Sequence, residues 1–159
     1  MPIRQLLCAI FSVMIIGSAS AKDYQYHPTI PKPTLSEVRY GPHERNVMDV
    51  WLAEGEGPRP FVLLIHGGGW SGGSKEVRIQ QFANIPRLLE AGISAVSINY
   101  SLIERNPKHK NPDLNTKKNP PVHLPLTDIA RALQFVRSQS KDWNVDKKRI
   151  GAAGASAGG

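Results

Sequence analysis

The alternation of hydrophobic and polar positions changes about a third of the way along the chain. Residues 47–53 alternate between apolar and polar side chains, with Asp49 on the polar face, and residues 37–40 alternate in the same way. Alternation of this kind predicts two half-buried strands, joined here by a turn over residues 41–46. Residues 61–65 are instead continuously apolar, which predicts a strand buried on both faces of a parallel sheet.

The second half of the chain alternates between helical and strand patterns. Apolar spacing predicts a helix over residues 76–91, which Pro86 should kink or restart as a second short helix. Residues 93–98 predict another buried strand. Residues 126–136 predict a helix with Asp128 in its first turn, favourably placed against the helix dipole. This order predicts an α/β fold in which right-handed βαβ units build a mostly parallel sheet.

The last predicted strand follows a turn at residues 144–146 and leads into small residues around one serine. Residues 154–159 fit the GxSxG pattern, in which a serine nucleophile lies on a sharp turn between a strand and a helix. The strand and the helix run close together there, so the positions around Ser156 must be almost free of side chains, as Gly154 and Gly158 are. Taken alone, the pattern is short enough to be an ordinary small-residue turn.

A second glycine-rich stretch directly follows the first buried strand. Residues 66–70 read His-Gly-Gly-Gly-Trp, an HGGG motif whose backbone N–H groups stabilise the oxyanion formed when a nucleophile attacks a carbonyl. Such a loop acts together with the N–H after the nucleophile, which here belongs to Ala157. His66 lies at the end of the strand, where it is expected to fix the loop rather than to act as a base.

The same loop also fits a different class of function. Gly67, Gly69 and Gly72 match GxGxxG between a strand and a predicted helix, which is the context of a dinucleotide-binding turn. Trp70 would crowd a pyrophosphate in that position, and the next strand ends at Asn99 rather than at an acidic residue for the ribose. Nucleotide binding is therefore the less favoured alternative.

Together the two motifs resemble those of the α/β-hydrolase superfamily, and within it the secreted carboxylesterases and lipases that carry HGGGW and GxSAGG. These include the feruloyl and acetyl-xylan esterase-like groups. The resemblance runs from about residue 36 to residue 159. It implies a serine hydrolase that cleaves small-molecule or polysaccharide-linked carboxylic esters through an acyl-enzyme intermediate, with no metal or cofactor. A serine peptidase of the same fold and a non-catalytic hydrolase-fold remnant are the alternatives.

The resemblance also implies roles for individual residues. Ser156 is the nucleophile, and the amides of the oxyanion hole come from Gly68, Gly69 and Ala157. The supporting positions of the scaffold and the pocket rim are His66, Trp70, Gly154 and Gly158.

The triad of this superfamily follows the order serine, acidic residue, histidine. Both partners of Ser156 are therefore expected beyond residue 159. We expect the chain to be the N-terminal part of a longer enzyme, with an incomplete α/β-hydrolase fold and no activity by itself. The strand that leads to the serine would then form an exposed edge of the sheet.

The N-terminal residues predict export. Arg4 is followed by an apolar run of eleven residues, 6–16, broken only by Ser12, and then by small residues, which together predict a signal peptide over residues 1–21. An uncleaved membrane anchor is the alternative, but the apolar run is well short of the ~20 residues that span a bilayer. We expect a secreted or periplasmic protein without stable membrane insertion, in which a proline-rich extended lead-in over residues 22–35 precedes the hydrolase region, 36–159.

Cysteine content and charge narrow the range of functions further. The only cysteine, Cys8, lies in the predicted signal peptide, so residues 22–159 offer no thiol for a disulfide or a metal. The formal charge of +7 arises partly from lysines in the Pro- and Asn-rich connection predicted over residues 99–124. No aromatic residues lie between these lysines, so the connection is read as a solvated loop and no nucleic-acid partner is expected.

Overall fold

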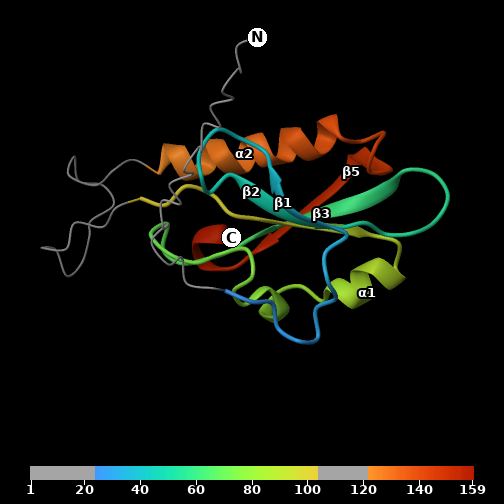
Figure 1. The fold of residues 1–159 in the computed structure, drawn as a ribbon, viewed down its shortest axis with the longest axis horizontal. Helices are drawn as coiled ribbons and strands as arrows, with labels where there is room; N and C mark the ends of the chain where they lie inside the picture. The colour runs from blue at the N-terminus through green and yellow to red at the C-terminus, as the bar shows by residue number, and fades with distance from the viewer. Residues whose placement is uncertain (1–23, 104–121) are drawn as a thin grey trace, which may run out of the picture.

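A computed structural model of the chain describes residues 24–103 and 122–159 (Figure 1). The signal peptide predicted over residues 1–21, with Cys8, lies outside the described residues. So does the basic part of the connection predicted over residues 99–124. Among the described residues, no helix combines the length and the apolar character needed to cross a membrane.

The fold is built on one mixed sheet of five strands in the order β1-β2-β4-β3-β5. Strands β4, β3 and β5 are parallel, as the βαβ pattern predicted, whereas β2 is antiparallel to both β1 and β4. The predicted pair of strands before the first buried strand is therefore confirmed as an antiparallel addition to the sheet. The strands are β1 Leu35–Arg39, β2 Val47–Trp51, β3 Arg59–Ile65, β4 Ser94–Ile98 and β5 Val145–Gly154.

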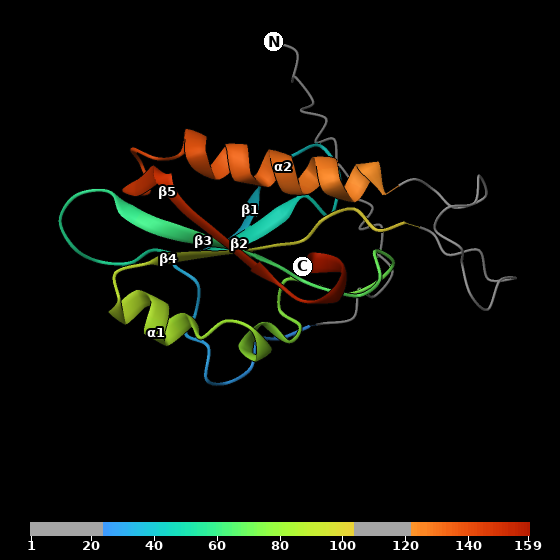
Figure 2. The same cartoon turned by 180° about the vertical axis from the view of Figure 1, so that it is seen from behind.

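The two α-helices of the described residues, α1 (Ile85–Glu90) and α2 (His123–Ser138), cover opposite faces of the sheet (Figures 1 and 2). Leu63 on β3 packs in the cluster that contains Val136 of α2, and its neighbour Leu64 packs with Ile85 of α1. The continuously apolar strand is therefore buried on both faces, as predicted, because each face of the sheet has its own hydrophobic core.

The prediction of one continuous helix over residues 76–91 is wrong. The predicted alternative, a second short helix that starts near Pro86, is correct. The chain forms a short 3₁₀ turn, Ile79–Gln81, after Arg78 takes a left-handed conformation with φ 60°. Helix α1 then begins afresh after Asn84, whose side chain accepts a hydrogen bond from the Arg87 N–H at 3.1 Å. A capping asparagine and a proline in the first turn are typical helix starts, so the helical spacing is divided between two short segments.

Helix α2 begins earlier than predicted, so Asp128 does not lie in its first turn. The carboxylate is fully buried, accepts a hydrogen bond from the Ser101 N–H at 2.9 Å and pairs with Arg131 at 2.8 Å. Burial alone would raise the pKa of Asp128, but hydrogen bonds from Ser101 and Asn46 together outweigh it and the pKa is lowered. The aspartate therefore ties the chain that leaves β4 to the helix, rather than interacting with the helix dipole.

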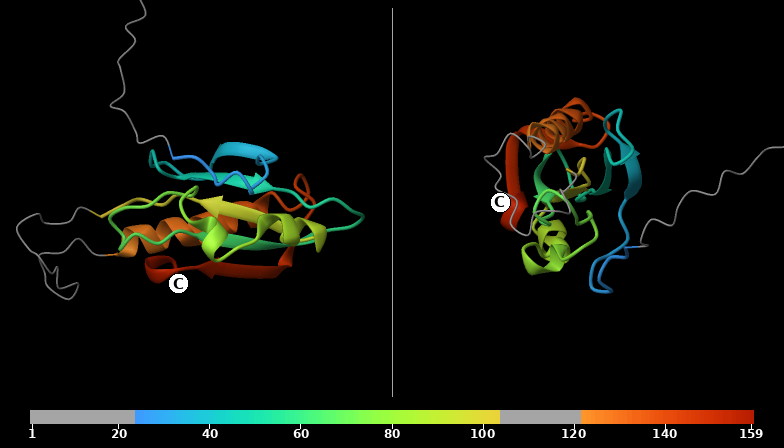
Figure 3. Two further views of the ribbon diagram at one scale, coloured as in Figure 1. Left: turned by 90° about the horizontal axis from the view of Figure 1, so that it is seen from below. Right: turned by 90° about the vertical axis from the view of Figure 1, so that its left-hand side faces the viewer.

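Strand β5 begins at Val145, so the predicted turn at residues 144–146 is shorter than expected. Among the described strands it pairs with β3 alone and lies at the edge of the sheet (Figure 3), and half of its residues are exposed. The expectation that the serine's strand forms an exposed edge is therefore confirmed within the described residues.

The lead-in to the sheet, residues 24–34, packs against the body of the protein. The Trp51 indole N–H on β2 donates to the Pro31 carbonyl at 2.8 Å.

Candidate active site

The two glycine-rich motifs meet at one edge of the sheet because β3 and β5 are parallel neighbours. Ile65, the last residue of β3, pairs in register with Gly154, the last residue of β5. The chain beyond each strand therefore emerges at the same edge. A Cβ atom placed on Gly67 would lie only 3.4 Å from the Cβ atom of Ser156. The glycine loop and the serine, distant in the sequence, are in direct contact.

Ser156 lies on a strained turn. The preceding Ala155 is extended, Ser156 itself has φ 56°, and a 3₁₀ turn, Ser156–Gly158, follows. The Gly158 N–H closes this turn by donating to the Ala155 carbonyl at 3.0 Å. A positive φ is uncommon for a residue other than glycine and is often found at functional sites. The serine is exposed on this bend, directly between the end of a strand and a short 3₁₀ turn, as its motif predicts for the start of a strand-turn-helix elbow.

Gly154 allows the turn to approach the neighbouring strand. A side chain there would place its Cβ 2.7 Å from the carbonyl oxygen of Ile65 and would also clash with the carbonyl of Gly158. The small residues around the serine are therefore required by close packing of the backbone, as the sequence pattern suggested.

The glycine loop presents bare backbone to the serine. Gly68 has φ 123°, and a Cβ on it would clash with the carbonyl oxygen of Gly72. Gly69 and Trp70 also have positive φ values, 58° and 63°. In the described part of the chain, the N–H groups of Gly68 and Gly69 donate to no backbone carbonyl. The third amide assigned to the oxyanion hole, that of Ala157, lies in the first turn of a helical segment, where an N–H has no partner within the segment.

Ser156, Gly68 and Gly69 line one cavity of about 500 Å³. A cavity of this size is in the range of small-molecule sites. Its other side chains come from the segment after the glycine loop and from the lead-in. These are Tyr24, Val77, Arg78, Gln81 and Phe82, and the two motifs themselves add His66 and Ala155 to the lining.

His66 holds the base of the glycine loop. Its ring is stacked on Tyr100, with centroids 4.2 Å apart, and its Nδ1 donates to the Gly67 carbonyl at 2.7 Å. The Tyr100 hydroxyl in turn donates to the His66 carbonyl at 2.7 Å. Burial lowers the pKa of His66 to about 4, so the ring is neutral at pH 7 with its proton on Nδ1. The buried Nε2 has no partner among the described residues.

Trp70 belongs to the packing behind the loop and does not line the cavity. Its ring is tilted against Tyr100 at a centroid distance of 5.7 Å, and its carbonyl accepts a hydrogen bond from the Ile103 N–H at 2.8 Å. Trp70 therefore supports the end of the loop from the side of β4.

Several residues that support the loop were not found from the sequence. The Arg45 guanidinium donates to the carbonyls of Tyr100 and Gly73, each at 2.9 Å, and the Asn99 side chain accepts a hydrogen bond from the Lys75 N–H at 2.7 Å. Arg45 looked like an ordinary turn residue because its partners lie far away in the sequence. The only usable signal was the position of Asn99 and Tyr100 directly after a buried strand.

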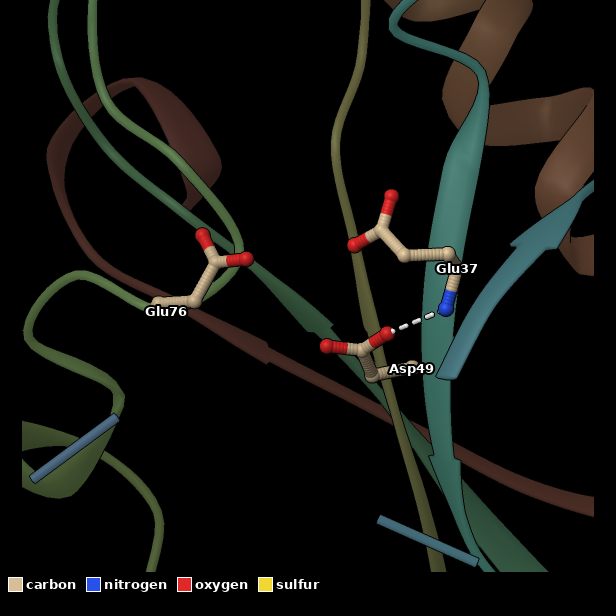
Figure 4. Close-up of side chains that lie close together, drawn as sticks. All are labelled: Glu37, Asp49 and Glu76. Atoms are coloured by element: carbon tan, nitrogen blue, oxygen red, sulfur yellow. Dashed lines mark hydrogen bonds between the residues drawn. The ribbon is translucent and has the colours of Figure 1, made fainter. Parts of the chain in front are cut away.

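Three carboxylates that could hold a cation lie away from the serine. The carboxylates of Glu37, Asp49 and Glu76 have oxygens within 4.8 Å of one another (Figure 4). The ammonium of Lys75 already lies among them and contacts all three. Its positive charge occupies the place that a metal ion would take, so the donor set does not fit a metal centre.

The dinucleotide alternative fails on geometry. A dinucleotide-binding turn places the pyrophosphate at the N-terminus of a helix that begins directly after the glycines. No helix begins there: the first helical turn after the loop is the 3₁₀ segment Ile79–Gln81, and α1 follows only at Ile85.

Comparison with known proteins agrees with the hydrolase-type site at the ends of β3 and β5. Residues 48–159 match the protein family BD-FAE. The chain belongs to the BD-FAE family. Among curated proteins it is similar to the esterase LipQ of Mycobacterium tuberculosis, with 32% identity over 82% of this chain and 30% of LipQ. It is also similar to the esterase LipC of the same organism, with 29% identity over 77% of this chain and 27% of LipC.

Solved structures confirm the fold. A truncated form of a carbohydrate esterase from gut microbiota matches with a TM-score of 0.60 and 22% identity, over 84% of this chain and 43% of that one. The described residues therefore form part of an α/β-hydrolase fold, as the two motifs implied. The chain spans less than a third of the length of LipQ and LipC.

Proposed function

We propose that this chain is the part of an exported serine hydrolase that carries the nucleophile and the oxyanion hole, and that the protein cleaves carboxylic esters. The observation that supports this most strongly is the shared cavity of Ser156, Gly68 and Gly69. The similarity to named esterases supports the same reaction.

The reaction follows from the positions of these groups. The Ser156 oxygen attacks the ester carbonyl carbon while its proton passes to a general base. The carbonyl oxygen becomes an oxyanion and accepts hydrogen bonds from the amides of Gly68, Gly69 and Ala157. The tetrahedral intermediate then collapses, the alcohol leaves with the proton, and water releases the acid from the acyl-enzyme. Each oxyanion donor contributes roughly 10²- to 10³-fold in kcat.

His66 is not the base of this reaction. The residue is 2% exposed, its Nε2 makes no hydrogen bond to Ser156 or to any other described group, and burial lowers its pKa to about 4, well below that of an effective base at pH 7. In this superfamily the acidic residue and the catalytic histidine follow the serine in the sequence. We assign the base to such a histidine beyond residue 159 in the full-length gene product.

We propose small-molecule or polysaccharide-linked esters as substrates. The structural neighbour named a carbohydrate esterase supports this class, and a cavity of about 500 Å³ beside Ser156 can take a small acyl or alcohol group. Export through the signal peptide that the sequence predicts at residues 1–21 would bring the protein to such substrates outside the cytoplasm. Sequencing the N-terminus of the exported protein tests this, and we expect it to begin at Lys22.

Active-site labelling of the full-length gene product tests the proposed function. A fluorophosphonate should modify Ser156 in the wild type and nothing in Ser156→Ala, and only the wild type should hydrolyse p-nitrophenyl acetate. Turnover of peptides in preference to esters would indicate a peptidase instead. Absence of labelling in a folded protein would indicate a non-catalytic remnant.

A further inference from the structure

A buried lysine lies at the point where the glycine loop returns to the body of the protein. The side chain of Lys75 is 3% exposed, and its ammonium contacts carboxylates from three segments. Glu37 comes from β1, Asp49 from β2 at an N–O distance of 2.9 Å, and Glu76 follows Lys75 directly. Figure 4 shows these three carboxylates converging from separate segments. The lysine therefore joins the loop to the two N-terminal strands.

An irregularity in β1 brings Glu37 to this cluster of Lys75 and three carboxylates. The pairing of β1 with β2 shifts register between Leu35 and Val38, and Glu37 has φ 54° at this irregularity. The N–H of Glu37 donates to one oxygen of Asp49 at 2.7 Å, and the Tyr26 hydroxyl donates to the other at 2.6 Å. Bulges of this kind redirect backbone and side-chain groups. Asp49, expected on a polar face, is instead 3% exposed because these groups cover it.

The backbone of Lys75 is fixed as firmly as its side chain. Its N–H donates to the Asn99 side chain at 2.7 Å, and its carbonyl accepts a hydrogen bond from the Ser97 hydroxyl at 2.7 Å. Both partners belong to β4 or follow it directly. Two residues earlier, the Gly73 carbonyl accepts a hydrogen bond from Arg45. Residues 73–75 are therefore tied to the sheet from both sides.

This segment is in direct contact with the part of the loop that presents the oxyanion amides. A Cβ on Gly73 would lie 2.5 Å from Nδ1 of His66, and one on Gly68 would clash with the carbonyl of Gly72. The two ends of the loop therefore pack against each other without spare room. A shift of residues 73–75 would move Gly68 and Gly69, whose amides act only when they are held close to their productive positions.

We infer that Lys75 is a positioning residue for the oxyanion-hole loop, an inference that rests on the proposed function. The ammonium touches no substrate: it pairs with three carboxylates and so holds β1, β2 and the end of the loop together. Without it, the buried carboxylate of Asp49, the largely buried one of Glu76 and the exposed one of Glu37 would repel one another and separate. The loop would then lose its tether while Ser156 and the cavity remained.

Lys75→Met in the full-length gene product tests this inference, with Lys141→Met as the matched control at an exposed position. We expect kcat for p-nitrophenyl acetate to fall by about 100-fold in Lys75→Met because the oxyanion donors are misplaced in the transition state. KM should stay within about twofold, since the donors bind the ground state weakly. Lys141→Met should match the wild type in both. A folded Lys75→Met with wild-type kcat, or one in which only KM changes, would overturn the inference.

Ser97→Ala covers the case in which Lys75→Met does not fold. It leaves every charge of the cluster in place and removes only the hydroxyl that holds the Lys75 carbonyl. We expect kcat to fall by roughly tenfold with KM unchanged, a smaller effect because the ion pairs persist. An unchanged kcat in folded Ser97→Ala would count against the tether.

Hydrogen exchange separates this inference from the proposed function. Peptides that cover residues 66–75 should exchange faster in Lys75→Met, or in Ser97→Ala, than in Lys141→Met. Unchanged exchange would contradict the tether whether or not the protein hydrolyses esters. Absence of ester hydrolysis in the wild type would contradict the proposed function instead, and the exchange result would still decide whether Lys75 holds the loop.

Discussion

The ring of His66 is stacked on the ring of Tyr100, with centroids 4.2 Å apart and planes 12° from parallel. The Tyr100 hydroxyl also donates to the His66 carbonyl, so one aromatic residue of the chain after β4 holds both the ring and the backbone at the start of the glycine loop. This contact connects the chain after β3 with the chain after its parallel neighbour β4. It makes Tyr100 the first position to test for the integrity of the loop.

Tyr100→Phe should destabilise the protein without disturbing the stacking. The substitution leaves the buried His66 carbonyl without its donor, and an unsatisfied buried group costs about 1 to 3 kcal/mol. Urea denaturation of the full-length gene product measures this loss. Tyr24→Phe, at a residue that is 42% exposed, is the control and should leave the free energy of unfolding unchanged. Equal stability of the two variants would show that the hydrogen bond contributes nothing.

His66 should make the protein less stable in acid. Its pKa falls from 6.5 in the unfolded chain to about 4 in the folded protein because the ring is buried. Between these values the unfolded state binds more protons, so stability rises as pH rises from 4 to 6.5 and falls as pH is lowered through the same window. The full difference corresponds to about 3 kcal/mol.

Denaturation at a series of pH values, with the wild type and His66→Gln compared, measures this contribution. A glutamine side chain does not titrate, so the difference in unfolding free energy between the two proteins should change with pH between 4 and 6.5 and stay constant above pH 7. A difference that is constant throughout would mean that the ring titrates normally in the folded protein.

Gly68→Ala should remove activity more severely than its stability loss explains. Gly68 has φ 123°, and the added Cβ would clash with the Gly72 carbonyl, so the backbone that carries the proposed oxyanion donor must move. We expect a fall in kcat of about 100-fold or more, the cost of losing one oxyanion donor. Gly57→Ala is the control because Gly57 also has positive φ, 69°, but no atom lies within 4 Å of its added Cβ. Similar kcat values for both variants would contradict the role of Gly68.

The order of elements and the two motifs could be predicted from the sequence because both depend on local patterns. An unbroken apolar run indicates a strand covered on both faces, and glycines around Ser156 indicate backbones in close contact. Parallel strands then bring the two motifs to one edge without further information. The shared edge of Ile65 and Gly154 follows from this topology alone.

The supports of the loop could not be predicted because they depend on which distant segments meet. Asp49 alternates with apolar residues as a solvent-facing residue does, and only the approach of Lys75 and Tyr26 makes its burial favourable. The helix over residues 76–91 was predicted wrongly for a related reason. Its apolar spacing is continuous, but the left-handed turn at Arg78 and the cap at Asn84 divide it.

The central claim is that the glycine-loop amides and the serine hydroxyl converge on one carbonyl. A crystal structure of the full-length gene product after reaction with a p-nitrophenyl phosphonate tests it most directly, because the bound phosphoryl oxygen mimics the oxyanion. We predict a covalent bond to the Ser156 oxygen and a phosphoryl oxygen about 2.7 to 3.1 Å from the amides of Gly68, Gly69 and Ala157. An unmodified Ser156, or a phosphoryl oxygen directed away from these amides, would contradict the account.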